Sequence, residues 1–479
     1  MNTCLQPSFS NSDDVMSPPQ LSLYVSTTDE NQQPSPDSRG DQYITGLIEG
    51  YGNISVNASG NIYVGVSAPQ VSVLDSTVWN FEVAVSLDQP YHQYNDTAPQ
   101  LKLLDSDANA ALLVTNGLAS ATPPNMSTSG WLQNGPPFSV FILNDNDTTT
   151  LGMRHSYCGL RQKSLISALN ISPADNAAQM LLTTKQPGPA PEQEIYVPRL
   201  NVSSTYLGFL VEAGNSSNQG AGVPGGGGTV YDMMNFTTKR DTNCAVIYNL
   251  SFCSTVAYAV PANPNTFPNL ANLTALYDED ASALYANFSY SLQQIACNTT
   301  ASAQYSLVKT CDDCATAYKT WLCAVTIPRC ADYSPAPIEQ EDASAYDFLM
   351  PRNVAQDPFP GSGVAKVTNH TLLDWLATNS SRNNATIAGT IQPGPYRELL
   401  PCEDLCYDLV RSCPAALDFG CPTRGKGLEA GYGVPGQAID GSPKCSIPGA
   451  VYRQNSGSTM RNGMMLRWTC IALCLFGAI

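Results

Sequence analysis

The chain has few histidines and few basic residues, and these shortages exclude several classes of function. Only three histidines occur in 479 residues, His92, His155 and His370, and no HExxH or GxSxG sequence is present. The usual metalloprotease and serine-hydrolase signatures are therefore missing. Lysine and arginine number 23 against 40 aspartates and glutamates, so the formal net charge is −17. That charge disfavours nucleic acid and anionic lipid as partners. We predict a protein that is not an enzyme, uses no cofactor and binds no nucleic acid.

Three short patterns imitate known sites but fit them poorly. Residues 220–225 spell GxGxxG, yet a proline and a run of glycines there indicate a hairpin loop rather than a helix start. Residues 105–109 begin like an EF-hand loop, but Ala110 stands where the turn glycine belongs. Cys311 and Cys314 form a CxxC without a second pair at zinc-finger spacing. We expect a loop, an acidic turn and disulfide cysteines; a weak Ca²⁺ site at the acidic turn remains the alternative.

Acceptor sequences for N-glycosylation are in clear excess. Asn-x-Ser/Thr occurs sixteen times, where this composition would produce it about five or six times by chance. The excess predicts a protein that passes through the endoplasmic reticulum and keeps these segments in solvent. The acceptors are Asn53, Asn57, Asn95, Asn125, Asn146, Asn170, Asn201, Asn215, Asn235, Asn249, Asn272, Asn287, Asn298, Asn369, Asn379 and Asn384.

The cysteines are concentrated in one part of the chain. Of sixteen, twelve lie between residues 244 and 445, Cys4 and Cys158 precede them, and Cys470 and Cys474 follow. In an oxidising compartment this density predicts a disulfide framework.

The N-terminal end lacks the signal peptide that a secreted protein needs, whereas the C-terminal end resembles the signal for a lipid anchor. Residues 1–7 contain neither a basic nor an apolar signal-peptide region, so we expect the sequence to begin downstream of the true start. The apolar run 468–479 has twelve residues, whereas a membrane-spanning helix needs about twenty. It fits the tail of a GPI signal with Asn455 or Ser456 as the attachment residue. A frayed tail or a helix end is the alternative.

Short strands are expected in the first half of the chain. Residues 79–87 alternate apolar with small or polar side chains, which predicts a strand with one buried face. Similar runs occur at 62–66, 71–74, 138–143 and 206–211. The segment 200–238 resembles the last two strands of a fibronectin type III sandwich, joined by a glycine-rich loop.

Helices are expected in the second half, where apolar residues recur at helical spacing. The stripes are Leu273, Leu276, Leu284, Phe288, Leu292 and Ile295; then Tyr318, Trp321 and Leu322; then Leu405, Leu409 and Leu417. The predicted fold class is α+β and multidomain, an N-terminal β-sandwich region followed by a helical, disulfide-rich module. The expected parts are a disordered leader at 1–40, a β-sandwich-like region at 41–150, a fibronectin III-like β-rich region at 151–242, a cysteine-rich domain at 243–450 and a GPI-signal-like tail at 451–479.

The cysteine spacing resembles a frizzled-type cysteine-rich domain. Cys253-Ser-Thr-Val-Ala-Tyr-Ala-Val-Pro, Cys314 with Cys323 nine residues later, and Cys402-Glu-Asp-Leu-Cys406 carry the likeness. A long insert before Cys402 and two extra cysteines depart from it. The resemblance implies the pairs Cys244 with Cys330, Cys253 with Cys323, Cys314 with Cys413, Cys402 with Cys445 and Cys406 with Cys421, and leaves the extras Cys297 and Cys311 to each other.

Over most of its length the chain resembles a second, more specific family. Gln20-Leu-Ser-Leu-Tyr-Val-Ser, Val64-Gly-Val-Ser-Ala-Pro and Asn249-Leu-Ser-Phe-Cys are similar to phrases of the fungal stretch-activated calcium-channel component, the mating-induced death protein family. The resemblance implies an accessory subunit on the extracellular face of the plasma membrane, bound to a pore-forming four-repeat calcium channel of the voltage-gated type. The alternative is a GPI-anchored surface receptor or wall protein that binds a lipid or a peptide.

One segment stands out as a candidate partner contact. Residues 402–445 contain no glycosylation acceptor, and a bulky glycan excludes a partner. Within the segment, Tyr407, Arg411 and Arg424 are the aromatic and basic side chains that interfaces favour, whereas Leu409 and Leu417 are expected in the core.

Overall fold

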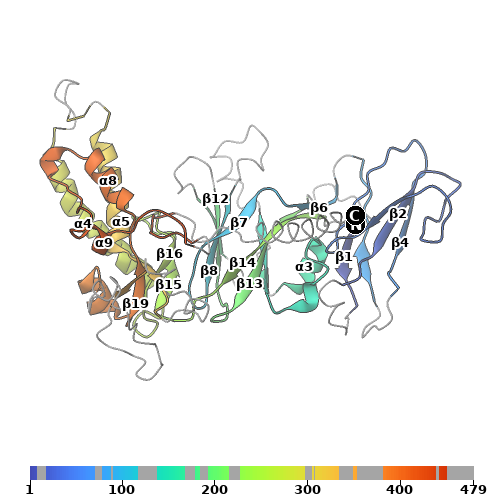
Figure 1. Cartoon of the computed structure of the whole chain (residues 1–479), viewed down its shortest axis with the longest axis horizontal. Helices are drawn as coiled ribbons and strands as arrows, with labels where there is room; N and C mark the ends of the chain where they lie inside the picture. Colours follow the sequence, from blue (N-terminus) through green and yellow to red (C-terminus); the bar gives the residue numbers. More distant parts are fainter. Residues whose placement is uncertain are drawn as a thin grey trace, which may run out of the picture.

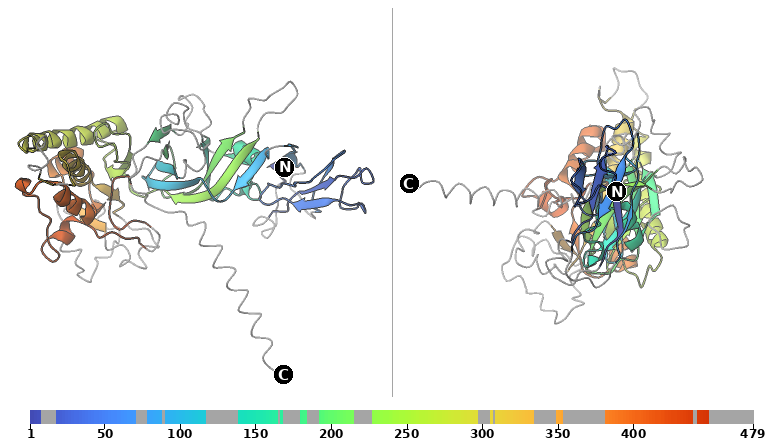
Figure 2. Two further views of the ribbon diagram at one scale, coloured as in Figure 1. Left: turned by 90° about the horizontal axis from the view of Figure 1, so that it is seen from above. Right: turned by 90° about the vertical axis from the view of Figure 1, so that its right-hand side faces the viewer.

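The protein is elongated, with three structural units in a row (Figures 1 and 2). A small β-rich unit contains the N-terminus, a two-sheet β-sandwich lies in the middle, and a helical module with many disulfides lies at the other end. The computed structural model describes residues 1–7, 18–70, 78–87, 90–116, 138–164, 166–167, 179–183, 192–214, 227–296, 305–306, 308–333, 349–352, 381–438 and 442–449. The fold therefore combines α-helices, β-strands and disulfides, as the sequence predicts.

The N-terminal unit is built from two small sheets. The first is antiparallel, with β2 (Ser22–Ser26) between β3 (Tyr43–Gly46) and β4 (Tyr63–Ser67). The second joins β1 (Asn2–Leu5) to β5 (Asn80–Glu82). Buried Met1, Leu21, Leu23, Val25 and Leu47 form the core of the unit.

The prediction of a disordered leader at 1–40 is therefore wrong. The described part of this stretch contains two strands, and Cys4 is joined to Cys158. Its polar composition is misleading because Asn31 and Gln42 fold residues 28–42 back through side-chain hydrogen bonds. Such bonds replace the apolar burial that ordered segments usually need.

A second correction concerns residues 79–87. Only Asn80–Glu82 is a strand, and Val83, Val85 and Leu87 are 40%, 69% and 98% exposed. The alternation is present in the sequence, but among the described residues β5 pairs with β1 alone and no second layer covers it. A periodic pattern predicts a buried face only where another layer packs onto it.

His92, the first residue of β6 (His92–Asn95), makes this part of the molecule sensitive to acid. Burial lowers the pKa of His92 to about 4, and Asn2 donates to its Nδ1 atom at 3.0 Å, so the neutral ring is the folded form. A group with a depressed pKa stabilises the fold above its ordinary pKa of 6.5, and that contribution is lost as the pH falls towards 4. We expect His92→Asn to reduce the loss of stability between pH 6.5 and 4, as measured by thermal unfolding. An unchanged pH dependence would contradict this assignment.

The central unit consists of two sheets that face each other. One has the strand order β10-β9-β13-β14-β6 and the other β11-β12-β8-β7. Residues from both sheets, including Leu113, Ile142 and Leu210, form one continuous core. The strands are β7 (Gln100–Ser106), β8 (Ala111–Asn116), β9 (Ser139–Asn144), β10 (Ile166–Ser167), β11 (Gln179–Thr183), β12 (Glu192–Val197), β13 (Thr205–Ala213) and β14 (Gly228–Thr237).

The expected domain boundary at residue 150 is not supported. β9 pairs with β13 and β8 pairs with β12, so strands from both sides of that boundary lie in the same two sheets. Hydrophobic periodicity shows where strands are but not which strands pair, and that pairing decides the domain boundary here.

The strand pair predicted in 200–238 is present as β13 and β14, which pair antiparallel. The Tyr206 hydroxyl accepts a hydrogen bond from the Asn201 backbone N–H at 2.7 Å, and the ring stacks on Phe236. A tyrosine at a strand start that bonds to the backbone a few residues upstream is typical of immunoglobulin-like sandwiches. The glycine-rich residues 220–225 lie outside the described residues.

The helical module begins with the hairpin of β15 (Cys244–Ile247) and β16 (Tyr258–Pro261). The three predicted helices are α4 (Leu270–Leu292), α5 (Cys311–Thr326) and α8 (Glu403–Ser412). Three stripe residues deviate from the expected helices. Leu284 is 41% exposed, and Ile295 lies beyond the end of α4. Leu417 lies beyond α8 in η6 (Ala415–Leu417), although it still packs against the core cluster that contains Leu409. The remaining elements are β17 (Arg329–Ala331), β18 (Leu349–Arg352), η5 (Asn384–Ile391), β19 (Tyr396–Leu399) and α9 (Leu428–Gly431).

Disulfides hold the helical module together. Five bonds join the cysteines that the frizzled-type resemblance pairs: Cys244 with Cys330, Cys253 with Cys323, Cys314 with Cys413, Cys402 with Cys445 and Cys406 with Cys421. Cys311 is also disulfide-bonded, while Cys297 lies outside the described residues. Since both cysteines of the CxxC are oxidised, neither is available as a zinc thiolate.

A buried ionic junction ties the sandwich to the helical module. Asp105, at the end of β7, is fully buried and bonds to Lys239 at 2.6 Å and to Arg329 of β17 at 2.8 Å. Burial alone would raise the pKa of Asp105, but these two cations and their hydrogen bonds hold it below its usual range. The carboxylate is therefore ionised and links elements that lie 134 and 224 residues away in the sequence.

The residues that begin like an EF-hand belong to the same junction. Asp107 accepts hydrogen bonds from the backbone N–H groups of Asn109, Ala110 and Val246 at 2.6–2.7 Å. Asp105 accepts a further one from Ala259 at 3.1 Å. Oxygens that face N–H donors are not arranged for a cation, so these residues form the acidic turn rather than a Ca²⁺ site.

Candidate functional site

The three predicted contact residues lie together at one end of the helical module. Glu403, Tyr407 and Arg411 are spaced by four residues and so follow one side of α8. Tyr407 is 43% exposed, Arg411 pairs with Asp408, and Arg424 bonds to Glu403 at 2.8 Å. The structure therefore places Arg424 at the N-terminal end of the same stripe.

α8 is held rigidly, which fixes the position of these side chains. Cys402, Cys406 and Cys413, at its start, within it and just after its end, are each bonded to another segment. Leu405 and Leu409 are buried, and Leu409 packs in a cluster with Phe288 of α4. Acidic residues in the first turn and Arg411 in the last match the helix dipole.

A groove of about 380 Å³ runs between α8 and α5. It is lined by Lys309, Asp312, Asp313, Thr316, Ala317, Thr320, Leu405, Asp408 and Ser412. Three carboxylates face one lysine there, so the groove is acidic. Thr310 begins α5 with a capping box, and hydrogen bonds from its backbone N–H and hydroxyl lower the pKa of Asp313. Asp313 therefore keeps its charge in mildly acidic surroundings.

We call the exposed part of these two helices the α5–α8 surface. Its residues are Asp312, Thr316, Asp404, Tyr407, Asp408, Val410 and Arg411. Sequence reasoning identified the α8 side but missed the α5 side. The sequence did contain a signal for the α5 side, because residues 299–368 also lack acceptor sequences. Only the fold, however, shows that α5 lies against α8.

Ten of the sixteen predicted glycosylation sites lie among the described residues. Nine acceptors are exposed, namely Asn53, Asn57, Asn146, Asn201, Asn235, Asn249, Asn272, Asn287 and Asn384, and Asn95 is half-buried. Asn125, Asn170, Asn215, Asn298, Asn369 and Asn379 lie outside the described residues, as do Asn455, Ser456 and the apolar tail. Asn272 and Asn287 are on α4, whereas α5 and α8 carry no acceptor.

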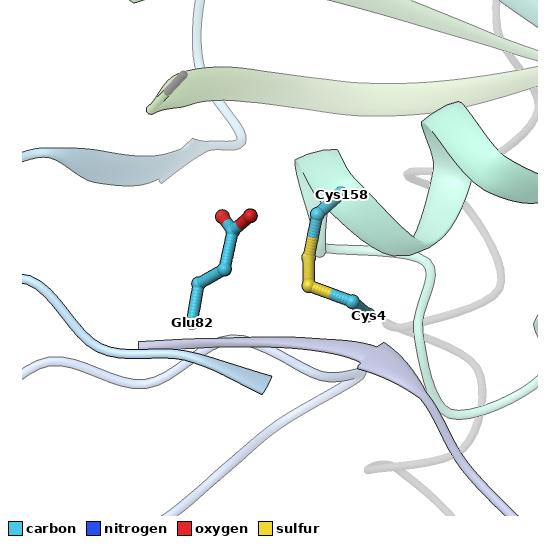
Figure 3. Close-up of side chains that lie close together, drawn as sticks. All are labelled: Cys4, Glu82 and Cys158. Carbon is cyan, nitrogen blue, oxygen red and sulfur yellow. A yellow bond between two sulfur atoms is a disulfide. The ribbon is translucent and has the colours of Figure 1, made fainter. Parts of the chain in front are cut away.

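Among the described residues, one close group of potential metal ligands occurs, and its chemistry does not favour a metal centre. Cys4, Glu82 and Cys158 form a close group, but Figure 3 shows that the two sulfur atoms are bonded to each other. A disulfide cannot supply the thiolates that bind a metal. His92 is buried at the start of β6 in the central unit. The His155 ring stacks on the Tyr94 ring with centroids 3.5 Å apart, and His370 lies outside the described residues. Within the described ranges, no helix has both the length and the apolar character that a bilayer crossing requires.

Comparisons with known proteins all point to the same family. A family model described as "Stretch-activated Ca2+-permeable channel component" matches residues 1–451. The chain is 35% identical to stretch-activated cation channel yam8 of Schizosaccharomyces pombe over 435 residues, which cover 88% of this chain and 77% of that protein. It is 31% identical to stretch-activated cation channel MID1 of Saccharomyces cerevisiae over 361 residues, covering 72% and 58%. The MID1 protein of Cryptococcus neoformans var. grubii is 24% identical over 458 residues, covering 86% and 68%.

Proposed function

Since this chain belongs to the family of stretch-activated Ca²⁺-permeable channel components, we propose that it is an extracellular accessory subunit of a plasma-membrane calcium channel. In this proposal a separate four-repeat subunit of the voltage-gated type forms the pore. The present chain binds the outer loops of that subunit and supports calcium influx under stretch or stress. It reaches the cell surface through the secretory pathway and is held there by its partner, by a GPI anchor, or by both.

The α5–α8 surface is the observation that carries this proposal. Nine exposed acceptor sites lie on the N-terminal unit, the sandwich and other parts of the module, and glycans on them would keep a large partner away. The α5–α8 surface has none, and three disulfides fix the position of α8. A rigid surface loses little conformational entropy on binding, and Tyr407 and Arg411 offer the side-chain types that interfaces favour.

A new glycan on α8 tests this proposal. Asp408→Asn with Val410→Thr creates an acceptor at two exposed positions, and we expect the variant to be exported while its co-purification with the channel falls at least about tenfold. A loss of only 1.4 kcal/mol in binding free energy suffices for that change. Immunoprecipitation from detergent-solubilised membranes measures it.

A matched control is available in the connection between the sandwich and the module. Arg240→Asn creates the acceptor Asn-Asp-Thr at an exposed position and should leave co-purification unchanged. If the α8 variant is glycosylated, exported and still recovered with the channel at wild-type yield, α8 is not the contact. A different outcome would favour the GPI-anchored receptor. In that outcome neither the wild type nor the α8 variant is recovered with a polytopic protein, and phosphatidylinositol phospholipase C releases both proteins from the membrane.

A further inference from the structure

A groove between the β-sandwich and the helical module has the chemistry of a sugar-binding site. Its volume is about 450 Å³, and its walls come from β12, the segment after β15, and α4. We call it the junction groove; the residues used below are Tyr196, Tyr248, Leu270, Thr274 and Asp278. It lies on a different part of the module from the α5–α8 surface.

The aromatic wall is fixed in place. Tyr196 and Tyr248 are stacked with ring centroids 4.9 Å apart, and burial raises the pKa of Tyr248 to about 12, so its hydroxyl stays neutral. Leu270 and Thr274, one turn apart on α4, also line the groove. A sugar ring has an apolar C–H face and a polar edge, and tyrosine offers an apolar face with a polar tip. Apolar walls with a few polar groups are what ligand sites generally have.

An acceptor asparagine forms part of the groove itself. Asn249, in the acceptor Asn249-Leu250-Ser251, is exposed and lines the groove together with both of those residues. Its backbone has φ of +56°, a left-handed conformation that asparagine tolerates better than most residues. The carboxylate of Asp278 accepts hydrogen bonds from the backbone N–H groups of Phe252 and Cys253 at 2.8 and 2.7 Å. These bonds fix the chain immediately after the acceptor.

We propose that the N-glycan on Asn249 folds back into the junction groove, with its first sugars against Tyr248 and Tyr196, and covers the boundary between the sandwich and the module. A tethered sugar experiences an effective concentration in the millimolar range, so weak stacking is enough to hold it. The proposal rests on glycosylation of Asn249 and not on the channel role; the two can therefore fail separately.

The test compares two glycans by their resistance to endoglycosidase H on the folded, full-length protein. Asn287 is the matched reference, because it is an exposed acceptor on α4 outside the groove. We expect the Asn249 glycan to be trimmed about tenfold more slowly than the Asn287 glycan, which corresponds to a docked state favoured by about tenfold. Tyr248→Ser should abolish the difference while Asn249 remains glycosylated. Peptide mapping assigns each site.

A second test uses three variants. Ser251→Ala removes the acceptor at Asn249, and the matched control Ser289→Ala removes the acceptor at Asn287. Ser251→Thr changes the same serine but keeps the acceptor at Asn249. We expect Ser251→Ala alone to speed limited proteolysis at the junction. We also expect it to let the groove take up free N-acetylglucosamine trimer, which the wild type and Ser251→Thr should not bind. The proposal is overturned if Asn249 is unmodified, if both glycans are trimmed at the same rate, or if the wild type binds the free trimer as well as Ser251→Ala does.

Discussion

Replacing Arg329 by methionine should lower the free energy of unfolding by about 3–5 kcal/mol, because it removes one of the two cations that pair with the buried carboxylate of Asp105. Arg329 is 1% exposed, lies 5.4 Å from the centre of the Tyr258 ring and donates to Asp105 at 2.8 Å. Denaturant unfolding followed by near-UV circular dichroism measures the loss. Proteolysis should show new cleavage between the sandwich and the module, since Asp105 connects them.

The control for this prediction uses the same substitution in an exposed ion pair. Arg411 pairs with Asp408 on the surface of α8, and its side chain is 70% exposed. Exposed pairs contribute about 0–1 kcal/mol, so Arg411→Met should have little effect on unfolding. Equal effects of the two substitutions would show that Asp105 does not depend on its buried partner.

The second large effect is expected from Cys253→Ser, which should cost about 2–5 kcal/mol and block export from the endoplasmic reticulum. Cys253 and Cys323 are each 1% exposed and lie in the largest core cluster of the module. Their bond joins residues separated by 70 positions, and the loss of a native disulfide from a secreted module often prevents folding. The fraction of protein that acquires cell-surface glycans measures export.

A milder result is expected for the bond between Cys406 and Cys421. Its sequence separation is 15, so the loop-closure entropy that it removes from the unfolded chain is about 3 kcal/mol rather than the larger value for a long loop. Cys421 is also only half-buried. Cys421→Ser should therefore reach the surface in larger amounts than Cys253→Ser, and the reverse order would contradict the assignment of the first bond to the core.

The helices and several strands could be predicted from the sequence because their signals are local. Apolar spacing places α4, α5 and α8, and the alternation at 138–143 and 206–211 coincides with β9 and β13. Strand pairing could not be predicted in the same way. β9 pairs with its neighbour β10 on one side, but on the other side it pairs with β13, some sixty residues later. Periodicity contains no information on partners so far apart.

The ionic junction shows the same limit for individual residues. Asp105 and Asp107 look like the start of a cation loop when read locally. Their partners, Lys239, Arg329 and Val246, come from segments far along the chain. The α5–α8 surface is an intermediate case, because the missing acceptor sequences pointed to α8, whereas the packing of α5 beside it appears only in the fold.

Co-purification at native expression level tests the central claim most directly. The full-length protein is recovered under mild detergent, and its partners are identified by mass spectrometry. We expect a polytopic channel subunit in amounts comparable to this chain. We also expect loss of that subunit in the Asp408→Asn/Val410→Thr variant and its retention in Arg240→Asn. Recovery of the properly exported wild-type protein without any polytopic partner would contradict the accessory-subunit role.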